Sequence, residues 1–389
     1  MVVLSNNDGC VVARSARSKE LGMKMGQPWH HVEPRLRDVT TAFSSNYALY
    51  ADMSNRFATI LSLMAPRLEI YSVDECFADL TGIRDIENHA HHIRARVLQW
   101  TGLPVCVGIG PTKTQAKLAN FIAKKWPRQD GVFDLGAMSA SARDALMSAI
   151  AVEEVWGVGP RTSASLQSLG IHNVLQLKQA NAKWIRSRFS VVVERIVQEL
   201  NGVACAELDV APADKQQIRS SRSFGSAVYS LSDLKEALNA FTGIAAEKLR
   251  AQSSKAGVLQ VFVSTNVFKP QSPQYSRGIT WRLPERTNDT RVLIQHGTRL
   301  LEALYRPGFE YKRCGVNLMD FAPAHEGQGV LFSSATPSKV SSALDAINAK
   351  FGRDSIAIGR VPGKRPWSMQ RTRLSKRYTT DPDELMLVR

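Results

Sequence analysis

The chain has 389 residues and carries 50 Lys and Arg residues against 35 Asp and Glu residues, a formal net charge of +15. At roughly 150 residues per domain, this length predicts about two to four domains. Hydrophobic residues make up 44%, which excludes general disorder. No apolar run approaches the roughly 18 residues that cross a bilayer, and the five scattered cysteines fit neither a disulfide framework nor a zinc site. We therefore expect a cytoplasmic protein with a polyanionic partner, most commonly nucleic acid.

The excess positive charge is concentrated in two stretches. Residues 215–320 hold 16 basic against 8 acidic residues, and residues 360–377 hold seven basic residues and no acidic one. A single basic stretch is usually a solvated surface, but two in one chain favour binding to a long polyanion.

The first region alternates strands with helices, which predicts an α/β domain. Residues 1–5 read as a short buried strand, followed by a turn and a small helix rich in Ala, Arg and Lys. Apolar residues at three- to four-residue spacing predict a longer helix from about Asn46 to Pro66. Residues 68–80 then read as two short strands that meet at an acidic turn.

The most informative helix is expected over Thr112–Trp126, after a buried strand at residues 104–110. Pro111 also suits the first position of a helix here. Four of its polar residues lie within about 60° of one another at 3.6 residues per turn. They are Lys113, Lys117, Asn120 and Lys124. This cationic stripe indicates phosphate binding, and an ordinary solvated face is the alternative.

Residues 132–208 carry a helical pattern throughout. Within it, Gly157-Val-Gly159 and the later Leu169-Gly-Ile171 resemble a helix-hairpin-helix. In that motif, the glycines Gly157 and Gly159 would let backbone N–H groups approach a phosphate where a helix begins.

From Ile218 to Phe321 the expected order is strand, helix, strand, strand, helix, strand, which is a second small α/β sandwich. Residues 322–389 are punctuated by Pro, Ser and Gly and have a basic end. We expect this extension to fold only in part, or on a partner.

Asp74 and Glu75 are the candidate metal ligands. They form an acidic pair at the tip of the hydrophobic hairpin, and two adjacent acids are tolerated when a divalent cation lies between them. Oxygen ligands on rigid strands suit Mg²⁺, whose remaining ligands are water and substrate phosphates. A solvated acidic turn is the alternative. Together with the cationic helix and the hairpin motif, the pair indicates metal-assisted phosphoryl transfer on nucleic acid.

Short segments in order along essentially the whole chain carry a family pattern. They are SNNDGCVVAR (5–14), FSSNY (43–47), YADMSNR (50–56), YSVDE (71–75), VGIGPTKTQAKLAN (107–120), VWGVG (155–159), SRSFG (221–225) and SKRYTT (375–380). These segments resemble the Y-family translesion DNA polymerases, and within that family the UmuC-type subunits.

The resemblance implies a multidomain α/β (α+β) fold in the form of a right hand. It comprises a ferredoxin-like palm (1–6 and 46–131), small fingers (7–45), a helical thumb with the helix-hairpin-helix (132–208), a ferredoxin-like little finger (215–321) and a UmuC-type C-terminal extension (322–389). By the same resemblance, the chain is a DNA-directed DNA polymerase that acts in SOS repair and mutagenesis with two Mg²⁺ ions.

The resemblance also implies roles for individual residues. Asp74 and Glu75 would be metal-site carboxylates, with Glu75 nearest the primer 3′-hydroxyl, and Lys19 and Lys124 would contact the incoming triphosphate. The expected DNA-binding residues are Lys113, Lys117, Gly157, Gly159, Arg219 and Arg222. The expected partners are primer-template DNA, deoxynucleotides, the sliding clamp, a UmuD′-like dimer and RecA, in a bacterial cytoplasm at the nucleoid.

Gln328, Leu331 and Phe332 resemble the Gln-x-x-Leu-Phe peptide with which polymerases bind the sliding clamp. The two apolar side chains would fill a pocket on the clamp.

One departure from the family pattern concerns the start of the chain. Family members begin with a strand whose Asp bridges both metals, followed by an Asn-x-Phe-Tyr-Ala-Ser segment whose aromatic residue excludes ribonucleotides. This sequence starts at the family's second strand, and the motif match places Asp8 in the fingers. We therefore expect an N-terminally truncated chain of weak or no polymerase activity, because of a late start codon or a truncated reading frame. The alternative functions are a non-catalytic DNA- and clamp-binding remnant and an unrelated helix-hairpin-helix nuclease.

Overall fold

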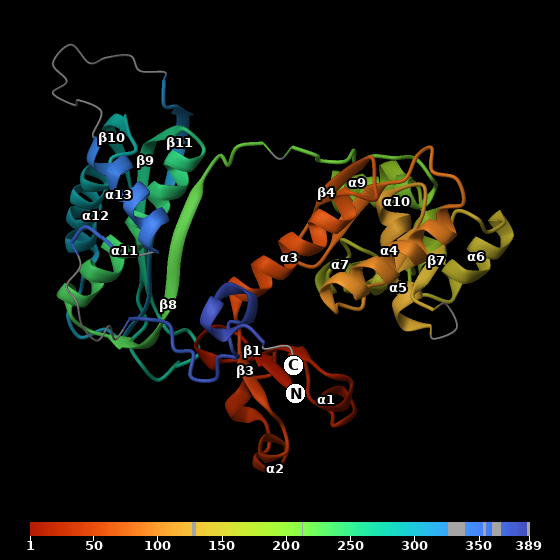
Figure 1. Ribbon diagram of the computed structural model, residues 1–389, viewed down its shortest axis with the longest axis horizontal. Coiled ribbons are helices and arrows are strands. Elements are labelled where there is room, and N and C mark those ends of the chain that lie inside the picture. The colour runs from red at the N-terminus through yellow and green to blue at the C-terminus, as the bar shows by residue number, and fades with distance from the viewer. Residues whose placement is uncertain (127–129, 212, 326–338, 353–354, 360–366, 387–389) are drawn as a thin grey trace. The chain divides into compact units, whose positions relative to one another are not determined.

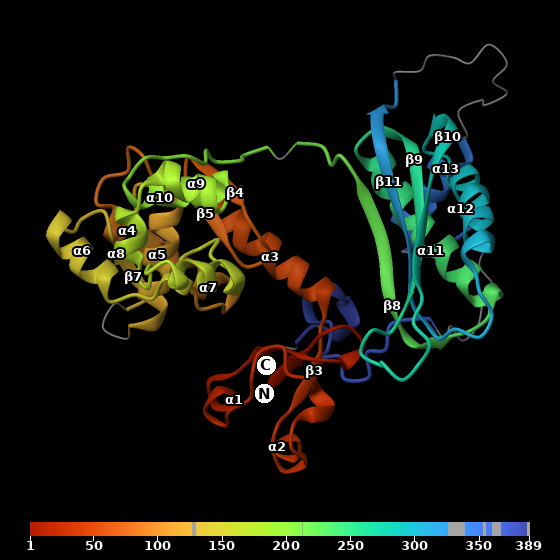
Figure 2. The same ribbon diagram turned by 180° about the vertical axis from the view of Figure 1, so that it is seen from behind.

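The computed structural model describes all residues except 127–129, 212, 326–338, 353–354, 360–366 and 387–389. The chain divides into two compact units (Figures 1 and 2). The first unit comprises Met1–Asn46 and Ala213–Lys376, and the second comprises Tyr47–Pro212 and Arg377–Arg389. Among the described residues, no helix combines the length and apolarity that a membrane span requires.

The first unit begins with a three-stranded sheet in the order β2-β1-β3. β1 runs antiparallel to β2 and parallel to β3, and its Val2 and Leu4 are buried with Val11 and Trp29. This pairing differs from the expected grouping of residues 1–6 with the palm strands, because both edges of β1 are paired within the N-terminal segment. The elements are β1 (Val2–Leu4), β2 (Val11–Arg14), α1 (Ala16–Glu20), α2 (Pro34–Asp38) and β3 (Ala42–Ser44).

The rest of the first unit is built on a four-stranded sheet in the order β10-β9-β11-β8, with α11 and α12 on one face (Figure 1). Alternating burial along the strands supplies one layer of the core, and apolar stripes of the helices supply the other. The element order confirms the β-α-β-β-α-β prediction, and we call residues 218–323 the sandwich. Its elements are β8 (Ile218–Val228), α11 (Leu231–Ala251), β9 (Ser254–Thr265), β10 (Ser276–Thr287), α12 (Thr290–Leu304) and β11 (Tyr311–Pro323).

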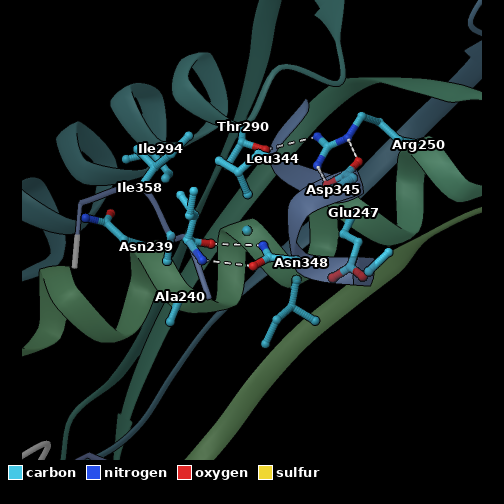
Figure 3. Close-up of a pocket in the computed structure, with 15 residues that line it drawn as sticks. Asn239, Ala240, Glu247, Arg250, Thr290, Ile294, Leu344, Asp345, Asn348 and Ile358 are labelled. Carbon is cyan, nitrogen blue, oxygen red and sulfur yellow. Dashed lines mark hydrogen bonds and ion pairs between the residues drawn. The ribbon is translucent and has the colours of Figure 1, made fainter. Parts of the chain in front are cut away.

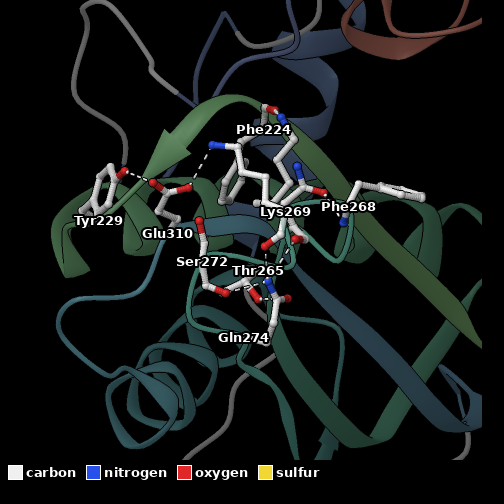
Figure 4. A network of polar contacts seen from close by, with 10 residues as sticks. Phe224, Tyr229, Thr265, Phe268, Lys269, Ser272, Gln274 and Glu310 are labelled. Atoms are coloured by element: carbon white, nitrogen blue, oxygen red, sulfur yellow. Dashed lines mark hydrogen bonds and ion pairs between the residues drawn. The ribbon is translucent and has the colours of Figure 1, made fainter. Parts of the chain in front are cut away.

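The loop between β9 and β10 is fixed by its own polar side chains (Figure 4). The Gln274 amide donates hydrogen bonds to the carbonyl oxygens of Asn266, Lys269 and Ser272, at 3.2, 2.8 and 3.0 Å. Lys269 also forms an ion pair with Glu310, at 3.1 Å. The loop therefore closes one end of the sandwich with a fixed conformation.

Part of the C-terminal extension folds onto the sandwich as a helix, α13 (Lys339–Phe351), which packs beside α11 and α12 (Figure 3). Arg250 of α11 donates to both carboxylate oxygens of Asp345, at 2.6 and 2.7 Å, and to Thr290 Oγ1 at 3.0 Å. The Arg250 side chain is only 13% exposed, so this ion pair is a buried anchor for α13.

Farther along, the extension contacts both α11 of the sandwich and the N-terminal segment of the same unit. The Trp367 ring packs against Phe241 with a centroid distance of 5.9 Å. The Ser44 backbone N–H donates to the Arg373 carbonyl at 2.8 Å, so the extension lies along the edge of β3. Asp8 accepts a hydrogen bond from the Thr372 hydroxyl at 3.0 Å, which is a structural contact.

The second unit begins with short strands and long helices. The four strands form two separate pairs, β4 with β5 antiparallel and β6 with β7 parallel. β7 was expected to be part of the helical region, but it pairs with β6 because Val132 faces a buried core. The elements are α3 (Tyr47–Ser62), β4 (Arg67–Ile70), β5 (Cys76–Asp79), α4 (Ile86–Thr101), β6 (Val107–Ile109), α5 (Lys113–Lys125) and β7 (Val132–Asp134).

The helix α5 begins at Lys113, two residues after Pro111, which the sequence favours as the first helical residue. Thr112 is its N-cap, and the Thr112 hydroxyl accepts a hydrogen bond from the Gln115 N–H at 3.2 Å. Pro111 therefore lies outside the helix, because the capping residue follows it.

The remainder of the second unit is helical and shares a hydrophobic core with the buried face of α5. Leu118 and Ile122 of α5 lie in this core with Leu166 and Ile196. The lysine-bearing helix is therefore held against the helical part. The helices are α6 (Ala140–Ser148), α7 (Pro160–Ser168), α8 (Val174–Gln179), α9 (Ala182–Arg188) and α10 (Val191–Leu200).

Candidate active site and nucleic-acid interface

The acidic pair lies in the turn that joins β4 to β5. The β4–β5 register ends at the pair of Ile70 and Cys76, and the N–H groups of Tyr71 and Ser72 both donate to the Glu75 carbonyl oxygen, at 3.1 and 3.0 Å. The turn is therefore closed by backbone hydrogen bonds. Both acids lie at the tip of the hairpin, as the sequence predicts, with Asp74 exposed and the Glu75 side chain 40% exposed.

Lys117 of α5 contacts this turn directly. Its ammonium group donates to Glu75 Oε1 at 2.6 Å, and its side chain is 17% exposed. The same ammonium lies 5.5 Å from the centre of the Tyr71 ring and 6.0 Å from the Trp156 ring. The sequence places Lys117 on the cationic stripe, but only the fold brings it to a candidate catalytic carboxylate.

The other lysines of the stripe have different surroundings. Lys113 forms an ion pair with Glu69 of β4 and donates to the Glu207 carbonyl oxygen at 2.7 Å, and its side chain is 12% exposed. Lys124 is exposed at the far end of the helix. Lys124 is therefore available to a ligand, whereas Lys113 is engaged within the protein.

Three aromatic rings connect the acidic turn to the helical part of the unit. Tyr71, Phe77 and Trp156 lie with ring centroids 5.5 to 5.6 Å apart, and the Trp156 indole N–H donates to the Tyr71 hydroxyl at 3.3 Å. Edge-to-face and tilted contacts of this kind stabilise packing beyond the buried area alone. Because Trp156 directly precedes Gly157, the hairpin motif is fixed beside the candidate catalytic turn.

The helix-hairpin-helix glycines lie where the sequence predicts them, just before α7. Gly157 has φ +89°, a left-handed conformation that favours glycine, and Gly159 is the N-cap of α7. No side chain caps this helix in the described structure. The N-terminal N–H groups of α7 are thus suited to a phosphate oxygen.

The basic face of the sandwich lies on the open side of its sheet. Arg219, Arg277 and Arg313 line one shallow concave surface around Phe262, and the Arg219 guanidinium lies 4.2 Å from the centre of the Phe262 ring. Arg222 is exposed, but it lies an odd number of residues from Arg219 on β8, so the two side chains point to opposite faces of the sheet.

The remaining predicted site residues lie elsewhere. Lys19 is exposed on α1 of the first unit. The predicted clamp-binding residues Gln328, Leu331 and Phe332 lie outside the described residues. Sequence reasoning missed the contacts of Tyr71, Trp156 and Glu69, because no local pattern reports which distant elements meet.

The oxygen donors of the acidic turn fit Mg²⁺ in kind. Asp74 and Glu75 provide hard carboxylate oxygens, and a bound Mg²⁺ would take its other ligands from water and substrate phosphate. Among the described residues, no group of three or more His, Cys, Asp or Glu side chains is placed to hold a metal. Burial raises the pKa of the neighbouring Cys76 thiol to about 11, so without a metal Cys76 is a neutral thiol at pH 7.

Comparison with protein families gives matches along most of the chain. The impB/mucB/samB family matches residues 1–120, and the impB/mucB/samB family C-terminal domain matches residues 215–331. A domain of unknown function, DUF4113, matches residues 338–388.

Relatives in bacteria cover the chain almost completely. Protein UmuC of Salmonella typhimurium strain LT2 is 43% identical over 398 residues, which cover 100% of this chain and 94% of the relative. Protein MucB of Escherichia coli is 42% identical over 390 residues, covering 98% and 91%. DNA polymerase IV of Caulobacter vibrioides is 26% identical over 359 residues, covering 90% and 84%.

Solved structures show the same fold at low sequence identity. A Y-family DNA polymerase chimera of Dbh and Dpo4 matches with a TM-score of 0.64 and 17% identity, covering 83% of this chain and 92% of the chimera. DinB from Sulfolobus solfataricus matches with a TM-score of 0.50 and 17% identity, covering 82% and 90%.

Proposed function

The chain belongs to the impB/mucB/samB family, and on this premise we propose that it is the catalytic subunit of an error-prone translesion DNA polymerase of the UmuC type. Its role is template-directed DNA synthesis past damaged bases in SOS repair and mutagenesis. The fold agrees with this proposal, because Y-family polymerase structures match more than four-fifths of the chain.

One observation links the proposed function to individual residues. Within a single unit, the acidic turn lies 2.6 Å from a lysine of α5, and an aromatic cluster joins that turn to the hairpin motif. The carboxylates proposed for a metal, a lysine of the cationic helix and the N–H groups proposed for a DNA phosphate therefore lie in one contiguous part of the unit. Nucleotidyl transfer requires this set of groups.

In the proposed reaction, the primer 3′-hydroxyl attacks the α-phosphate of a deoxynucleotide and pyrophosphate leaves. Asp74 and Glu75 would hold the two expected Mg²⁺ ions, with Glu75 nearest the 3′-hydroxyl. When bound, the metal supplies charge neutralisation at the attacking and leaving oxygens. Lys124 and Lys19 would bind and orient the triphosphate as point charges.

The DNA backbone would be bound by two separate surfaces. The N-terminal N–H groups of α7 and the arginines of the sandwich sheet supply hydrogen bonds and positive charge without reading the base sequence. Among the residues that the sequence assigns to DNA binding, Arg219 lines a basic concave surface, which supports its proposed role.

Primer extension on an abasic template with Mg²⁺ tests the catalytic proposal. We expect weak extension by the wild-type chain that Asp74→Asn and Glu75→Gln abolish, while both variants retain primer-template binding. Absence of wild-type extension alongside normal DNA binding would instead support the non-catalytic remnant. That alternative is favoured by the lack of a three-ligand metal cluster among the described residues.

Salt-dependent DNA binding tests the proposed interface. Arg219→Ala should reduce the slope of log K against log salt by about 1, as expected for one lost phosphate contact. Arg286→Ala is the matched control, because Arg286 is bound to Asp320 at 2.7 Å within the sandwich. An unchanged slope for Arg219→Ala would exclude Arg219 from the interface.

The proposed protein partners are the sliding clamp, a UmuD′-like dimer and RecA, in the bacterial cytoplasm at the nucleoid. Deletion of Leu331 and Phe332 should abolish capture of the chain by immobilised clamp. Undiminished capture would remove the clamp peptide from the proposal.

A further inference from the structure

The carboxylate turn already has a cation bound to it, and that cation belongs to the protein. The Lys117 ammonium lies 2.6 Å from Glu75 Oε1, so one lone pair of a proposed metal ligand is occupied by a lysine N–H. The pair is shielded on the lysine side, where 17% of the side chain is exposed, and open on the glutamate side, where 40% is exposed. A ligand from solvent can therefore reach Glu75 while Lys117 stays covered.

The lysine has a second set of partners that does not depend on Glu75. Its ammonium lies within 5.5 Å of the Tyr71 ring centre and 6.0 Å of the Trp156 ring centre, and a cation over an aromatic face is electrostatically favourable. These rings are fixed against each other by their own contact, with centroids 5.5 Å apart. Displacement from the carboxylate therefore leaves Lys117 with a favourable position nearby.

We propose that Lys117 is the internal counter-ion of the acidic turn and competes with the divalent metal for Glu75, so that it sets the affinity of the site. This inference rests on the proposed function, since it takes the turn to be the metal site. Lys117 is a positioning residue in this scheme. Without metal it prevents Asp74 and Glu75 from repelling each other, and it raises the metal concentration at which the site fills.

Two opposite effects follow when the charge of Lys117 is removed. The metal-free turn loses its compensating charge, so the unit should become less stable. The metal no longer competes with a positive charge close to its ligand, so its affinity should rise, on the order of tenfold. A lysine with a purely structural role would produce the first effect without the second.

The test is Mn²⁺ binding by the full-length chain, measured by electron paramagnetic resonance and isothermal titration, together with thermal melting in EDTA and in Mn²⁺. Lys117→Met keeps the length of the side chain and removes its charge. We expect Lys117→Met to melt below wild type in EDTA, to bind Mn²⁺ about tenfold more tightly and to gain more stability from Mn²⁺ than wild type does. Lys117→Arg, which keeps the charge, should bind Mn²⁺ like wild type.

The matched control is Lys178→Met. Lys178 pairs with Asp144 at 2.6 Å with side-chain exposures of 21% and 38%, nearly the same as the Lys117–Glu75 pair, but far along the chain from the acidic turn. Lys178→Met should lower the melting temperature equally in EDTA and in Mn²⁺, with no change in Mn²⁺ affinity.

The outcomes separate this inference from the function on which it rests. If Mn²⁺ binding is lost in the Asp74→Asn, Glu75→Gln double variant but Lys117→Met binds no more tightly than wild type, the competition is refuted and the metal site stands. If Mn²⁺ binding is absent, or is the same in the double variant as in wild type and Lys117→Met, the metal site itself is refuted. The inference is then refuted as well.

Discussion

A buried carboxylate on α10, Glu199, provides the sharpest stability prediction. Its side chain is 3% exposed and accepts four hydrogen bonds. Oε2 accepts from the backbone N–H and the hydroxyl of Thr114, at 2.9 and 2.5 Å, and Oε1 accepts from the N–H groups of Cys205 and Ala206, at 3.3 and 3.1 Å. Glu199 therefore joins the end of α10 to the first turn of the lysine-bearing helix α5.

Glu199→Gln keeps the shape of the side chain but replaces one acceptor oxygen by a donor NH₂ group. The new NH₂ group then faces at least one backbone N–H donor, because only the Thr114 hydroxyl can rotate to accept from it. Each lost hydrogen bond to a charged group is worth about 1.5–3 kcal/mol. We expect the substitution to destabilise the second unit by about 3 kcal/mol. The assay is urea unfolding of the full-length chain, with amide hydrogen exchange to show that Thr114 and Ala206 lose protection.

Glu194→Gln on the same helix is the matched control. Glu194 is also buried, but it forms an ion pair with Arg186, at 3.2 Å, whose side chain is 62% exposed. Its neutralisation should cost below about 1 kcal/mol, because ion pairs open to solvent contribute little. The reasoning would be refuted if Glu199→Gln cost no more than Glu194→Gln, or if exchange at Thr114 were unchanged.

Three further predictions concern the hairpin motif, the extension and an acidic side chain of β5. Gly157→Ala should lower the melting temperature and the affinity for primer-template DNA, because φ is +89° and the new Cβ would lie 3.0 Å from the Ile196 side chain. Gly159→Ala is the control. No atom lies within 4 Å of its new Cβ, so it should leave the melting temperature unchanged. Arg250→Leu should lower the free energy of unfolding by about 3 kcal/mol and expose α13 to limited proteolysis, because it leaves a partly buried Asp345 without its partner. Unaltered cleavage would show that other contacts hold α13. The Thr81 hydroxyl, the Thr81 N–H and the Arg67 guanidinium lower the pKa of Asp79 to about 2. The ionised Asp79 therefore stabilises the fold fully above its unfolded pKa of about 4. This stabilisation is lost as the pH falls from about 4 to 2. Acid unfolding curves of Asp79→Asn should be flatter than wild type in that window, and identical curves would contradict the assignment.

The local elements and the chemistry they carry could be predicted from consecutive residues alone. Alternation and helical spacing predicted the β4–β5 hairpin with Asp74 and Glu75 at its tip, the cationic stripe of α5 and the element order of the sandwich. These features are local, because the spacing of apolar residues along one helix or strand is visible in consecutive residues of the sequence. The family motifs likewise lie in short continuous segments.

The three-dimensional fold was needed to show which distant segments meet. It paired β1 with β2 and β3, placed β7 beside β6, and anchored the C-terminal helix through Arg250. It also showed that two lysines of one stripe have different partners, Lys117 on Glu75 and Lys113 on Glu69. Helical spacing fixes only the face on which a side chain lies. What covers that face depends on contacts between residues far apart in the chain, which form only when the long loops between them are closed.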